Sequence, residues 1–282
     1  VEPCYGACDL KDNEAKALGA QLLVHFGHTQ FVKKNEIGTV YIPLEYGANA
    51  KEIAALAGKL ASLLKEKKLK SVALCSTIQF KKHRLLLRKA LEEKGFRAFE
   101  GKGRNVEPGQ VLGCNYSSVK AIEPKAEAIV FVGDGLFHPI GLGFAANKPV
   151  FVFDPLQREA FGLEQQKDLF LRKRIAMVEK ARQAKSIAIW VSTKKGQQRA
   201  KLAFALKEKF ERQGKKAIVI ASDFLSPQYL LGMKIDAIVC TACPRIALDD
   251  SSQYNAPVIN PVEALIVLGE KKIEEYAFDE LC

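Results

Sequence analysis

Cysteine is the residue type in this sequence best suited to metal or redox chemistry. There are seven: Cys4, Cys8, Cys75, Cys114, Cys240, Cys243 and Cys282. A chain of 282 residues can bury a core large enough to fold without disulfide bonds. These thiols are therefore interpreted as buried small side chains, metal ligands or catalytic groups.

The sequence contains an internal repeat, which relates the cysteines to predicted strands. Three apolar segments of equal length, each predicted to be a strand with a small residue near its end, lie at 21–28, 127–134 and 236–243, and each is followed by a second β-like run at 39–44, 148–154 or 256–260. The offsets are 127 − 21 = 106 and 236 − 127 = 109. Uninterrupted apolar strands that alternate with helices are typical of parallel sheets covered on both faces. The pattern predicts an α/β fold of three pseudo-repeated Rossmann-like domains, whose small parallel sheets surround a central cavity.

The repeat also predicts the order of the elements. We expect strands at 70–77 and 185–193, amphipathic helices at about 82–94 and 198–213 that stop at a glycine, and connecting helices at about 48–67 and 163–184. The expected domains are residues 1–47, the remainder of domain 1, then 48–158 and 159–282. Extrapolation by the offset, 71 − 106 = −35, predicts that roughly 35 to 45 residues precede Val1 in the complete protein.

Three cysteines occupy informative places in this repeat. Cys8 and Cys114 differ by 114 − 8 = 106 and are therefore equivalent. The third repeat carries Cys243 at the end of its strand, where the first two repeats carry His28 and Asp134. Each position lies at or beyond the carboxyl end of a predicted parallel strand, the edge where open α/β sheets bind ligands.

Three converging thiolates suit a 4Fe-4S cluster with one iron open to a substrate. A structural zinc site would need four ligands, and the Cys240–Cys243 pair has no second pair. A thioredoxin-like redox role for that pair is an alternative, although Cys240 falls inside the strand, where a buried apolar role is expected.

The other thiols have simpler interpretations. Cys75 is expected to be a buried strand residue and Cys282 a frayed terminal thiol. Cys4 rivals Cys8 because both flank the same Tyr-Gly-Ala turn, and only the repeat offset favours Cys8.

Charge and hydropathy limit the function classes. The net charge is 43 − 32 = +11, and the basic residues are spread along predicted helix faces, which indicates a solvated surface suited to an acidic partner. The sequence contains no basic patch interleaved with aromatic residues, which is the pattern typical of nucleic-acid binding. Direct nucleic-acid binding is therefore not expected. The sequence has no apolar run of about 18 residues and no leader pattern, so no membrane association and a cytoplasmic location are expected.

Four short motifs resemble those of the diphthamide biosynthesis enzymes of archaeal type. They are Pro-Cys-Tyr-Gly-Ala-Cys-Asp at 3–9, Leu-Val-His-Phe-Gly-His at 23–28, Val-Leu-Gly-Cys-Asn at 111–115 and Ala-Cys-Pro-Arg-Ile at 242–246. The resemblance covers essentially the whole chain in the right order. It implies three similar α/β domains, a homodimer, and one 4Fe-4S cluster bound by Cys8, Cys114 and Cys243.

The resemblance also implies an activity. Enzymes of this family transfer the 3-amino-3-carboxypropyl group of S-adenosylmethionine (SAM) to the imidazole carbon of one histidine in translation elongation factor 2, the first step of diphthamide biosynthesis. Methylthioadenosine is left over. This is non-classical radical SAM chemistry, and the CxxxCxxC loop of most radical SAM enzymes is indeed absent from the sequence. An electron donor is implied as a further partner.

Several polar residues are candidates for the rest of the site. His28 and Asp134 are candidates for catalysis, by holding the amino acid part of SAM or the target imidazole, and a structural hydrogen-bonding role is the alternative for both. Arg245 is a catalytic candidate that would pair with the SAM carboxylate, or would instead tune the charge of the cluster. The candidates for binding SAM are His138 and, in a loop that resembles an anion-binding turn at 192–197, Gly196 and Gln197.

Two other functions remain open at this point. One is a quinolinate synthase-like iron-sulfur enzyme, which also combines three pseudo-repeated α/β domains with three cysteine ligands. The other is a non-catalytic protein that binds a small ligand and whose cysteines are incidental.

Overall fold

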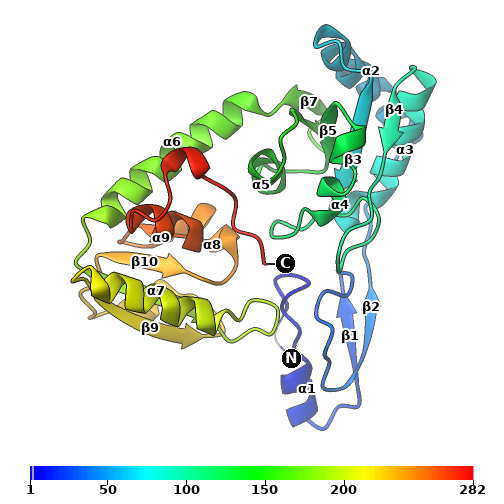
Figure 1. The fold of residues 1–282 in the computed structure, drawn as a ribbon. Coiled ribbons are helices and arrows are strands. Elements are labelled where there is room, and N and C mark those ends of the chain that lie inside the picture. Colours follow the sequence, from blue (N-terminus) through cyan, green and yellow to red (C-terminus); the bar gives the residue numbers. More distant parts are fainter. Residues whose placement is uncertain (2, 282) are drawn as a thin grey trace. The chain divides into compact units, whose positions relative to one another are not determined.

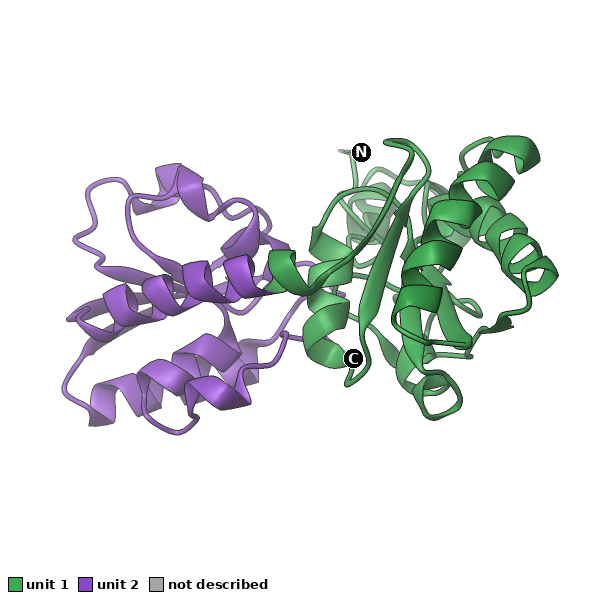
Figure 2. Cartoon of the chain, turned by 90° about the horizontal axis from the view of Figure 1, so that it is seen from above, with its two compact units in different colours: residues 1–167, 282 green, residues 168–281 purple. Residues whose placement is uncertain are grey.

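The computed structural model describes residue 1 and residues 3–281, which form two compact units, 1–167 and 168–281 (Figure 2). Within the described residues the strands form three separate sheets. Two of these sheets belong to the first unit and one to the second. The limits of three domains at 1–47, 48–158 and 159–282 stay a prediction, and the expectation for Cys282 lies outside the described residues.

The larger sheet of the first unit has the order β4-β3-β5-β6-β7 (Figure 1). Its strands are β3 (Ser71–Ser76), β4 (Arg97–Phe99), β5 (Ala128–Val132), β6 (Val150–Asp154) and β7 (Glu159–Gly162). All pairs are parallel except β6 with β7. Every residue of β3, β5 and β6 is buried, as expected for central strands of a covered sheet. The carboxyl ends of β3, β5 and β6 therefore meet at one edge.

Helices α2 (Ala50–Glu66) and α3 (Lys81–Glu93) pack into the core of this sheet. The buried face of α2 presents Ile53, Leu56, Leu60 and Leu64, at the three- and four-residue spacing of one helical stripe. Asn49 caps the helix by accepting a hydrogen bond from the backbone N–H of Lys51 at 3.0 Å. The shorter helices α4 (Ser117–Lys120) and α5 (Phe137–Ala145) complete this part.

The second unit is built on a fully parallel sheet of order β11-β10-β8-β9. Its strands are β8 (Ser186–Ser192), β9 (Lys216–Ser222), β10 (Ala237–Cys240) and β11 (Val258–Ile259). Its helices are α7 (Ala200–Arg212), α8 (Pro244–Leu248) and α9 (Pro261–Val267), together with most of α6 (Glu164–Arg182), which begins in the first unit. Trp190 is fully buried at the centre of this core.

A small parallel sheet of β1 (Leu22–Phe26) and β2 (Gly38–Ile42) follows helix α1 (Asp12–Ala17). Its alternate residues differ sharply in burial. Leu22, Val24 and Phe26 are 56%, 43% and 56% exposed, whereas His25 is 4% exposed. The two strands pair only with each other within the described part of the chain. One apolar face of this ribbon is therefore exposed.

The expected class, α/β with small parallel sheets, is confirmed. The three repeated segments form β1, β5 and β10, and the expected connecting helices are α2 and α6. The antiparallel edge strand β7 was not predicted, because its four residues carry no strong β pattern. Short 3-10 turns occur at Ile78–Phe80, Glu123–Lys125, Pro227–Leu230, Ser251–Gln253 and Ile273–Glu275.

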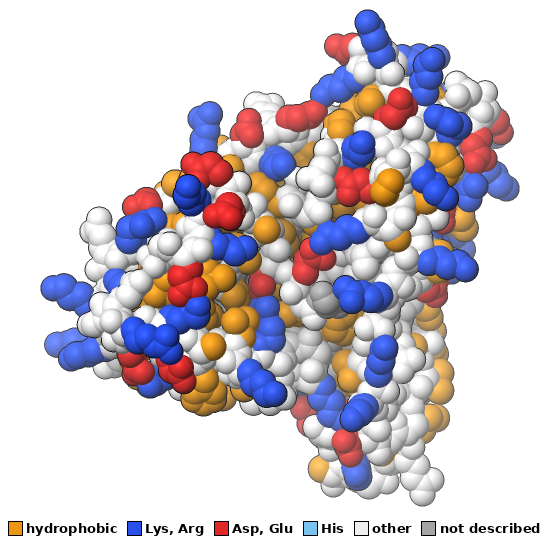
Figure 3. Space-filling view, in the orientation of Figure 1, with side chains coloured by type: hydrophobic (Ala, Val, Ile, Leu, Met, Phe, Trp, Pro, Cys, Tyr) orange, Lys and Arg blue, Asp and Glu red, His pale blue; other side chains and the backbone are white. Residues whose placement is uncertain are grey.

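The surface agrees with the charge pattern of the sequence. Figure 3 shows Lys and Arg side chains spread over the visible face and interspersed with Asp and Glu. Among the described helices, none combines the length and the hydropathy needed to cross a lipid bilayer.

Candidate functional site

Cys8 lies in a short turn near the start of the chain. The backbone N–H of Asp9 donates to the carbonyl of Gly6 at 3.0 Å, and the Asp9 carboxylate accepts from the backbone N–H of Tyr5 at 3.2 Å. Asp9 is buried, whereas Cys8 is partly exposed. The turn thus anchors Asp9 in the interior and leaves the neighbouring thiol accessible.

Cys114 lies at the tip of a tight turn. Leu112 and Asn115 exchange two backbone hydrogen bonds of 3.0 Å, and Gly113 and Cys114 form the bend between them. A Cβ atom on Gly113 would lie 1.9 Å from the ring of Phe137, so only glycine fits there. Close packing against Phe137 therefore explains the glycine of the Leu-Gly-Cys motif, which the sequence alone did not explain.

A buried arginine holds the chain that leads to this turn. Arg84 on α3 is 2% exposed and donates to the carbonyl of Pro108 at 2.9 Å and to the Ser76 hydroxyl at 2.8 Å. Its charge is compensated by Glu100, whose carboxylate oxygen lies 3.3 Å from Nη2 of Arg84. Pro108 lies six residues before Cys114, so Arg84 fixes the approach to the turn.

Cys243 precedes α8 and occupies the N-cap position of that helix. Arg199 donates to the carbonyl oxygens of Thr241 at 2.6 Å and Ala242 at 3.2 Å, directly before the cysteine. Both terminal nitrogens of Arg199 also bind the carboxylate of Asp279, at 2.9 and 2.6 Å. The ion pair thus fixes the Arg199 guanidinium, and the guanidinium in turn fixes the backbone directly before Cys243.

The other end of α8 is held by a second buried pair. Arg174 on α6 donates to the carbonyl of Ala247 at 2.7 Å and to that of Val258 at 2.8 Å. It also makes two bonds of 2.7 Å to the carboxylate of Glu263, which is fully buried. Neither Arg174 nor Arg199 was predicted from the sequence, because their partners are distant along the chain. Those of Arg174 are 73 to 89 residues away.

Two cysteines lie inside strands and differ from Cys8, Cys114 and Cys243. Cys75 and Cys240 are 0% exposed, as expected, and burial raises the pKa of each thiol to about 12. Both are therefore protonated at neutral pH and are poor metal ligands. The buried role predicted for them is confirmed.

Cys8, Cys114 and Cys243 match the donor chemistry of a 4Fe-4S cluster. Each is a thiol in a loop or turn outside the strands, and the burial of Cys8 and Cys243 is only partial. Thiolate is the ligand such clusters require, and three ligands leave one iron for another molecule. The residues present therefore fit the group, and these three cysteines stay the predicted ligands.

A cavity of about 780 Å³ opens at the carboxyl ends of β5 and β6. Asp134, which follows β5, lines it together with Asp154 at the end of β6 and Lys59 of α2. Asp134 is exposed there. The cavity offers carboxylates and one cation, which suits a zwitterionic ligand.

The other candidate side chains have identified neighbours. His138 on α5 stacks on Phe131, with ring centroids 5.8 Å apart, and meets Phe137 edge-on. Arg245 is exposed and donates to the carboxylate of Asp249 at 2.8 Å, one turn along the helix. Its pairing with a neighbour on the same helix leaves a partly hydrated guanidinium that another anion can approach.

The predicted anion-binding loop forms a turn between β8 and α7. The backbone N–H of Gln197 donates to the carbonyl of Lys194 at 2.9 Å, and the Lys194 ammonium lies 4.1 Å from the ring centroid of Phe224. Gly196 is partly exposed and Gln197 is buried. The turn therefore presents Gly196, rather than the Gln197 side chain, to solvent.

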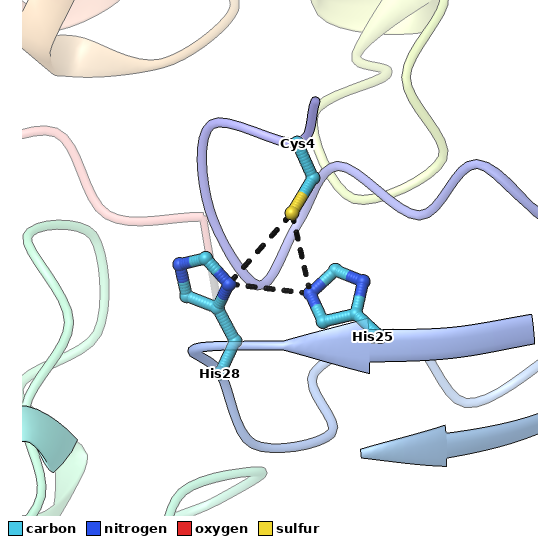
Figure 4. Close-up of side chains that lie close together, drawn as sticks. All are labelled: Cys4, His25 and His28. Atoms are coloured by element: carbon cyan, nitrogen blue, oxygen red, sulfur yellow. Dashed lines mark hydrogen bonds between the residues drawn. The ribbon is translucent and has the colours of Figure 1, made fainter. Parts of the chain in front are cut away.

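His28 lies in a group that the sequence did not predict. The Cys4 thiol is 3.7 Å from Nε2 of His25 and 3.9 Å from Nδ1 of His28, and the two ring nitrogens are 3.2 Å apart (Figure 4). Burial lowers the pKa of both histidines, so both imidazoles are neutral at pH 7. The His-Phe-Gly-His spacing was a signal that could have pointed to this group.

Comparison with known proteins supplies the family. The family model described as "Putative diphthamide synthesis protein" matches residues 1–277. The chain belongs to the diphthamide synthesis family. This membership confirms the resemblance read from the four motifs and leaves no support for the two alternative functions.

Curated relatives and a solved structure are similar over nearly the whole chain. The 2-(3-amino-3-carboxypropyl)histidine synthase of Pyrococcus horikoshii is 37% identical over 280 residues, which are 98% of this chain and 78% of the relative. The enzyme of the same name from Methanocaldococcus jannaschii is 32% identical, over 99% of this chain and 76% of the relative. A crystal structure of Dph2 from Pyrococcus horikoshii with a 4Fe-4S cluster matches with a TM-score of 0.88 at 35% identity, over 99% of this chain and 79% of that one.

Proposed function

We propose that the chain is a 2-(3-amino-3-carboxypropyl)histidine synthase that uses SAM to modify a histidine of translation elongation factor 2. One observation carries the proposal: three cysteines stand on separate loops in a chain that is similar, over 99% of its length, to a structure described with a 4Fe-4S cluster. The names of the curated relatives support the group that is transferred.

Cys8, Cys114 and Cys243 would hold the cluster. When bound, a reduced 4Fe-4S cluster supplies the electron that cleaves a sulfonium, and an open iron can bind the substrate. Arg84 and Arg199 are positioning residues for two of the three loops, because they bind the backbone just before the cysteine turns. The protein thus contributes rigid ligand placement.

SAM offers an ammonium, a carboxylate and a sulfonium, and the candidate residues match these groups. Asp134 would accept from the ammonium, and Arg245 would pair with the carboxylate. His28 would meet the target imidazole. His138 and Gly196 would complete the SAM contacts, and the buried Gln197 would support the turn that carries Gly196.

The net reaction is balanced in atoms and electrons. The bond between the SAM sulfur and the aminocarboxypropyl carbon breaks, and a bond between that carbon and the imidazole carbon forms. Methylthioadenosine leaves, and the imidazole C–H gives up one proton. The electron that starts cleavage is returned when the modified ring regains its aromaticity, so the reaction is redox-neutral overall.

The partners follow from this chemistry. Elongation factor 2 is the macromolecular substrate, and an electron donor is needed to reduce the cluster. The enzyme acts as a homodimer, the assembly that the family resemblance implies for archaeal members. Its substrate works in translation, so the enzyme acts in the cytoplasm. Direct nucleic-acid binding is not part of the proposal.

The test is anaerobic cluster assembly followed by dithionite reduction in the presence of SAM and archaeal elongation factor 2. Methylthioadenosine and the mass of the histidine-containing peptide are measured. The expected result is one aminocarboxypropyl group per factor, and its loss in Cys8→Ala, Cys114→Ala and Cys243→Ala. Cys75→Ala is the matched control, because this buried thiol is not a predicted ligand.

Other outcomes have definite meanings. A chain that assembles no cluster contradicts the assignment of the three cysteines. A chain that assembles a cluster but cleaves no SAM contradicts the proposed reaction. Loss of the cluster in Cys75→Ala alone would shift the ligand assignment to the strand cysteines.

A further inference from the structure

Cys4, His25 and His28 form a compact group of three metal-ligating side chains. One sulfur and two ring nitrogens lie within 4.8 Å of one another. From this arrangement we infer that the chain has a second metal site, in which these three residues bind a Zn²⁺ ion. The site uses none of the three cysteines assigned to the cluster.

The separations match the edges of a zinc tetrahedron. With Zn–N of about 2.05 Å and Zn–S of about 2.3 Å, the two nitrogens of a tetrahedral site lie about 3.3 Å apart, and each lies about 3.6 Å from the sulfur. The observed separations are 3.2 Å between the nitrogens, and 3.7 and 3.9 Å from them to the sulfur. One ion can therefore contact all three atoms with little movement.

The local structure explains why both histidines reach the same point. In a continued strand, residues 25 and 28 would face opposite sides of the sheet. Gly27 interrupts the strand with a φ of +87°, a left-handed conformation that favours glycine. Its carbonyl accepts from the Gln79 side chain at 2.8 Å, which holds the bend in place. The His28 ring is thereby turned back toward His25.

The donor set selects the ion. One thiolate with two imidazoles suits Zn²⁺ better than the hard cations Mg²⁺ and Ca²⁺, which prefer oxygen. Three protein ligands leave the fourth position of the tetrahedron for water or for a donor atom of another molecule. Cys4 lies four residues before Cys8, so an ion here would also fix the start of the loop that carries Cys8.

Co²⁺ is the spectroscopic probe for this site. The titration uses the full chain with Cys8, Cys114 and Cys243 replaced by alanine, so that the assigned cluster ligands cannot bind the probe. The expected result is one equivalent of Co²⁺ with the visible bands of tetrahedral cobalt and an ultraviolet thiolate charge-transfer band. Zn²⁺ should then displace the cobalt.

Single substitutions on that background test each ligand. Cys4→Ser should abolish the charge-transfer band, and His25→Asn or His28→Asn should weaken Co²⁺ binding by at least roughly 100-fold, more than the loss of an outer-shell partner. His138→Asn is the matched control and should leave binding unchanged. Added Zn²⁺ should raise the melting temperature of the parent and not that of Cys4→Ser, which distinguishes a lost ligand from a misfolded variant.

The inference is overturned if Co²⁺ binds without a thiolate band, or if Cys4→Ser and the parent bind it equally. In the unsubstituted chain with its cluster assembled, metal analysis should find one zinc in addition to the cluster iron. Iron without zinc contradicts the second site alone. Zinc without iron contradicts the proposed function and leaves the second site standing.

Discussion

Arg84 and Arg199 serve the same purpose at two different turns. Each guanidinium binds backbone carbonyl oxygens on the approach to a predicted cluster cysteine, and each is compensated by a carboxylate. A guanidinium can do this because its donors diverge in one plane and reach several acceptors at once. The positions of the cysteine turns therefore depend on residues that are distant in sequence.

Replacement of Arg199 by methionine should affect both stability and iron binding. It leaves the buried carboxylate of Asp279 without its bidentate partner and frees the carbonyls before Cys243. We expect a loss of about 2 to 4 kcal/mol in the free energy of unfolding, and reduced iron content after cluster assembly. Arg212→Met, which removes an exposed arginine of the same unit, should change stability by less than about 0.5 kcal/mol. Equal stability and iron content in the two variants would refute the positioning role.

Gly113→Ala should disturb the Cys114 turn through steric overlap. The added methyl would overlap the Phe137 ring and force the turn or α5 to move. A cost of about 1 to 3 kcal/mol is expected from such overpacking, with loss of iron binding. Gly58→Ala on α2 is the control: no atom lies within 4 Å of its added methyl, and alanine there should stabilise the helix by about 0.5 to 1 kcal/mol. Urea unfolding and iron analysis measure both effects.

His83 should make the first unit sensitive to acid. It is 4% exposed, and its Nδ1 has no hydrogen-bond partner among the described residues. Burial lowers the pKa of its imidazole below the usual 6.5. Below pH of about 6.5 the unfolded chain takes up the proton first, so the free energy of unfolding falls as the pH falls, by at most about 1.4 kcal/mol per pH unit for one group.

The variant His83→Gln isolates this contribution from those of His25 and His28, whose pKa values are also lowered. Urea unfolding of parent and variant at several pH values between 7.5 and 5 should show a shallower decline in the variant. Parallel curves would mean that His83 titrates alike in the folded and unfolded chains.

At the scale of elements, the repeated strands were predictable because apolar runs of parallel sheets are distinctive. The predicted segments 21–28, 127–134 and 236–243 all contain strands, and α2 and α6 lie within two residues of their expected limits. The antiparallel strand β7 and the 3-10 turns were not predictable, since tertiary contacts decide such short elements. The Cys4–His25 contact was missed for the same reason, because it depends on how a loop returns to a strand end.

Arg174 joins several elements of the second unit at one point. It connects α6 to α9 through Glu263, and to the ends of α8 and β11 through their carbonyl oxygens. Arg174→Met should therefore lower the free energy of unfolding by about 3 to 5 kcal/mol, because it leaves a buried carboxylate uncompensated.

Two further variants, measured by chemical denaturation, test whether charge burial causes this loss of stability. Arg182→Met on the same helix removes an exposed arginine and should cost less than about 0.5 kcal/mol. The double variant Arg174→Met/Glu263→Gln keeps the capping interaction of α9 but removes the orphaned charge, so it should recover part of the loss. A double variant less stable than Arg174→Met would argue against charge burial as the cause.

At the scale of the whole molecule, the net charge of +11 has a consequence for binding of elongation factor 2, the proposed substrate. If the factor presents an acidic face, salt should screen the attraction. Raising the ionic strength to about 0.5 M should increase the KM for the factor on the order of tenfold, with little change in kcat at saturation. The absorbance of the proposed cluster serves as the control for an intact protein. A KM independent of salt would mean that recognition does not rely on charge.

The two faces of the ribbon formed by β1 and β2 carry different kinds of side chain. The inward row carries His25, opposite Tyr41, and the outward row carries Leu22, Val24 and Phe26. Since successive side chains of a strand point to opposite faces, the outward row can be changed to threonine or lysine without touching the chemistry of the inward row. Polar residues in the outward row should therefore suppress association of this chain through the exposed apolar face during concentration and crystallisation.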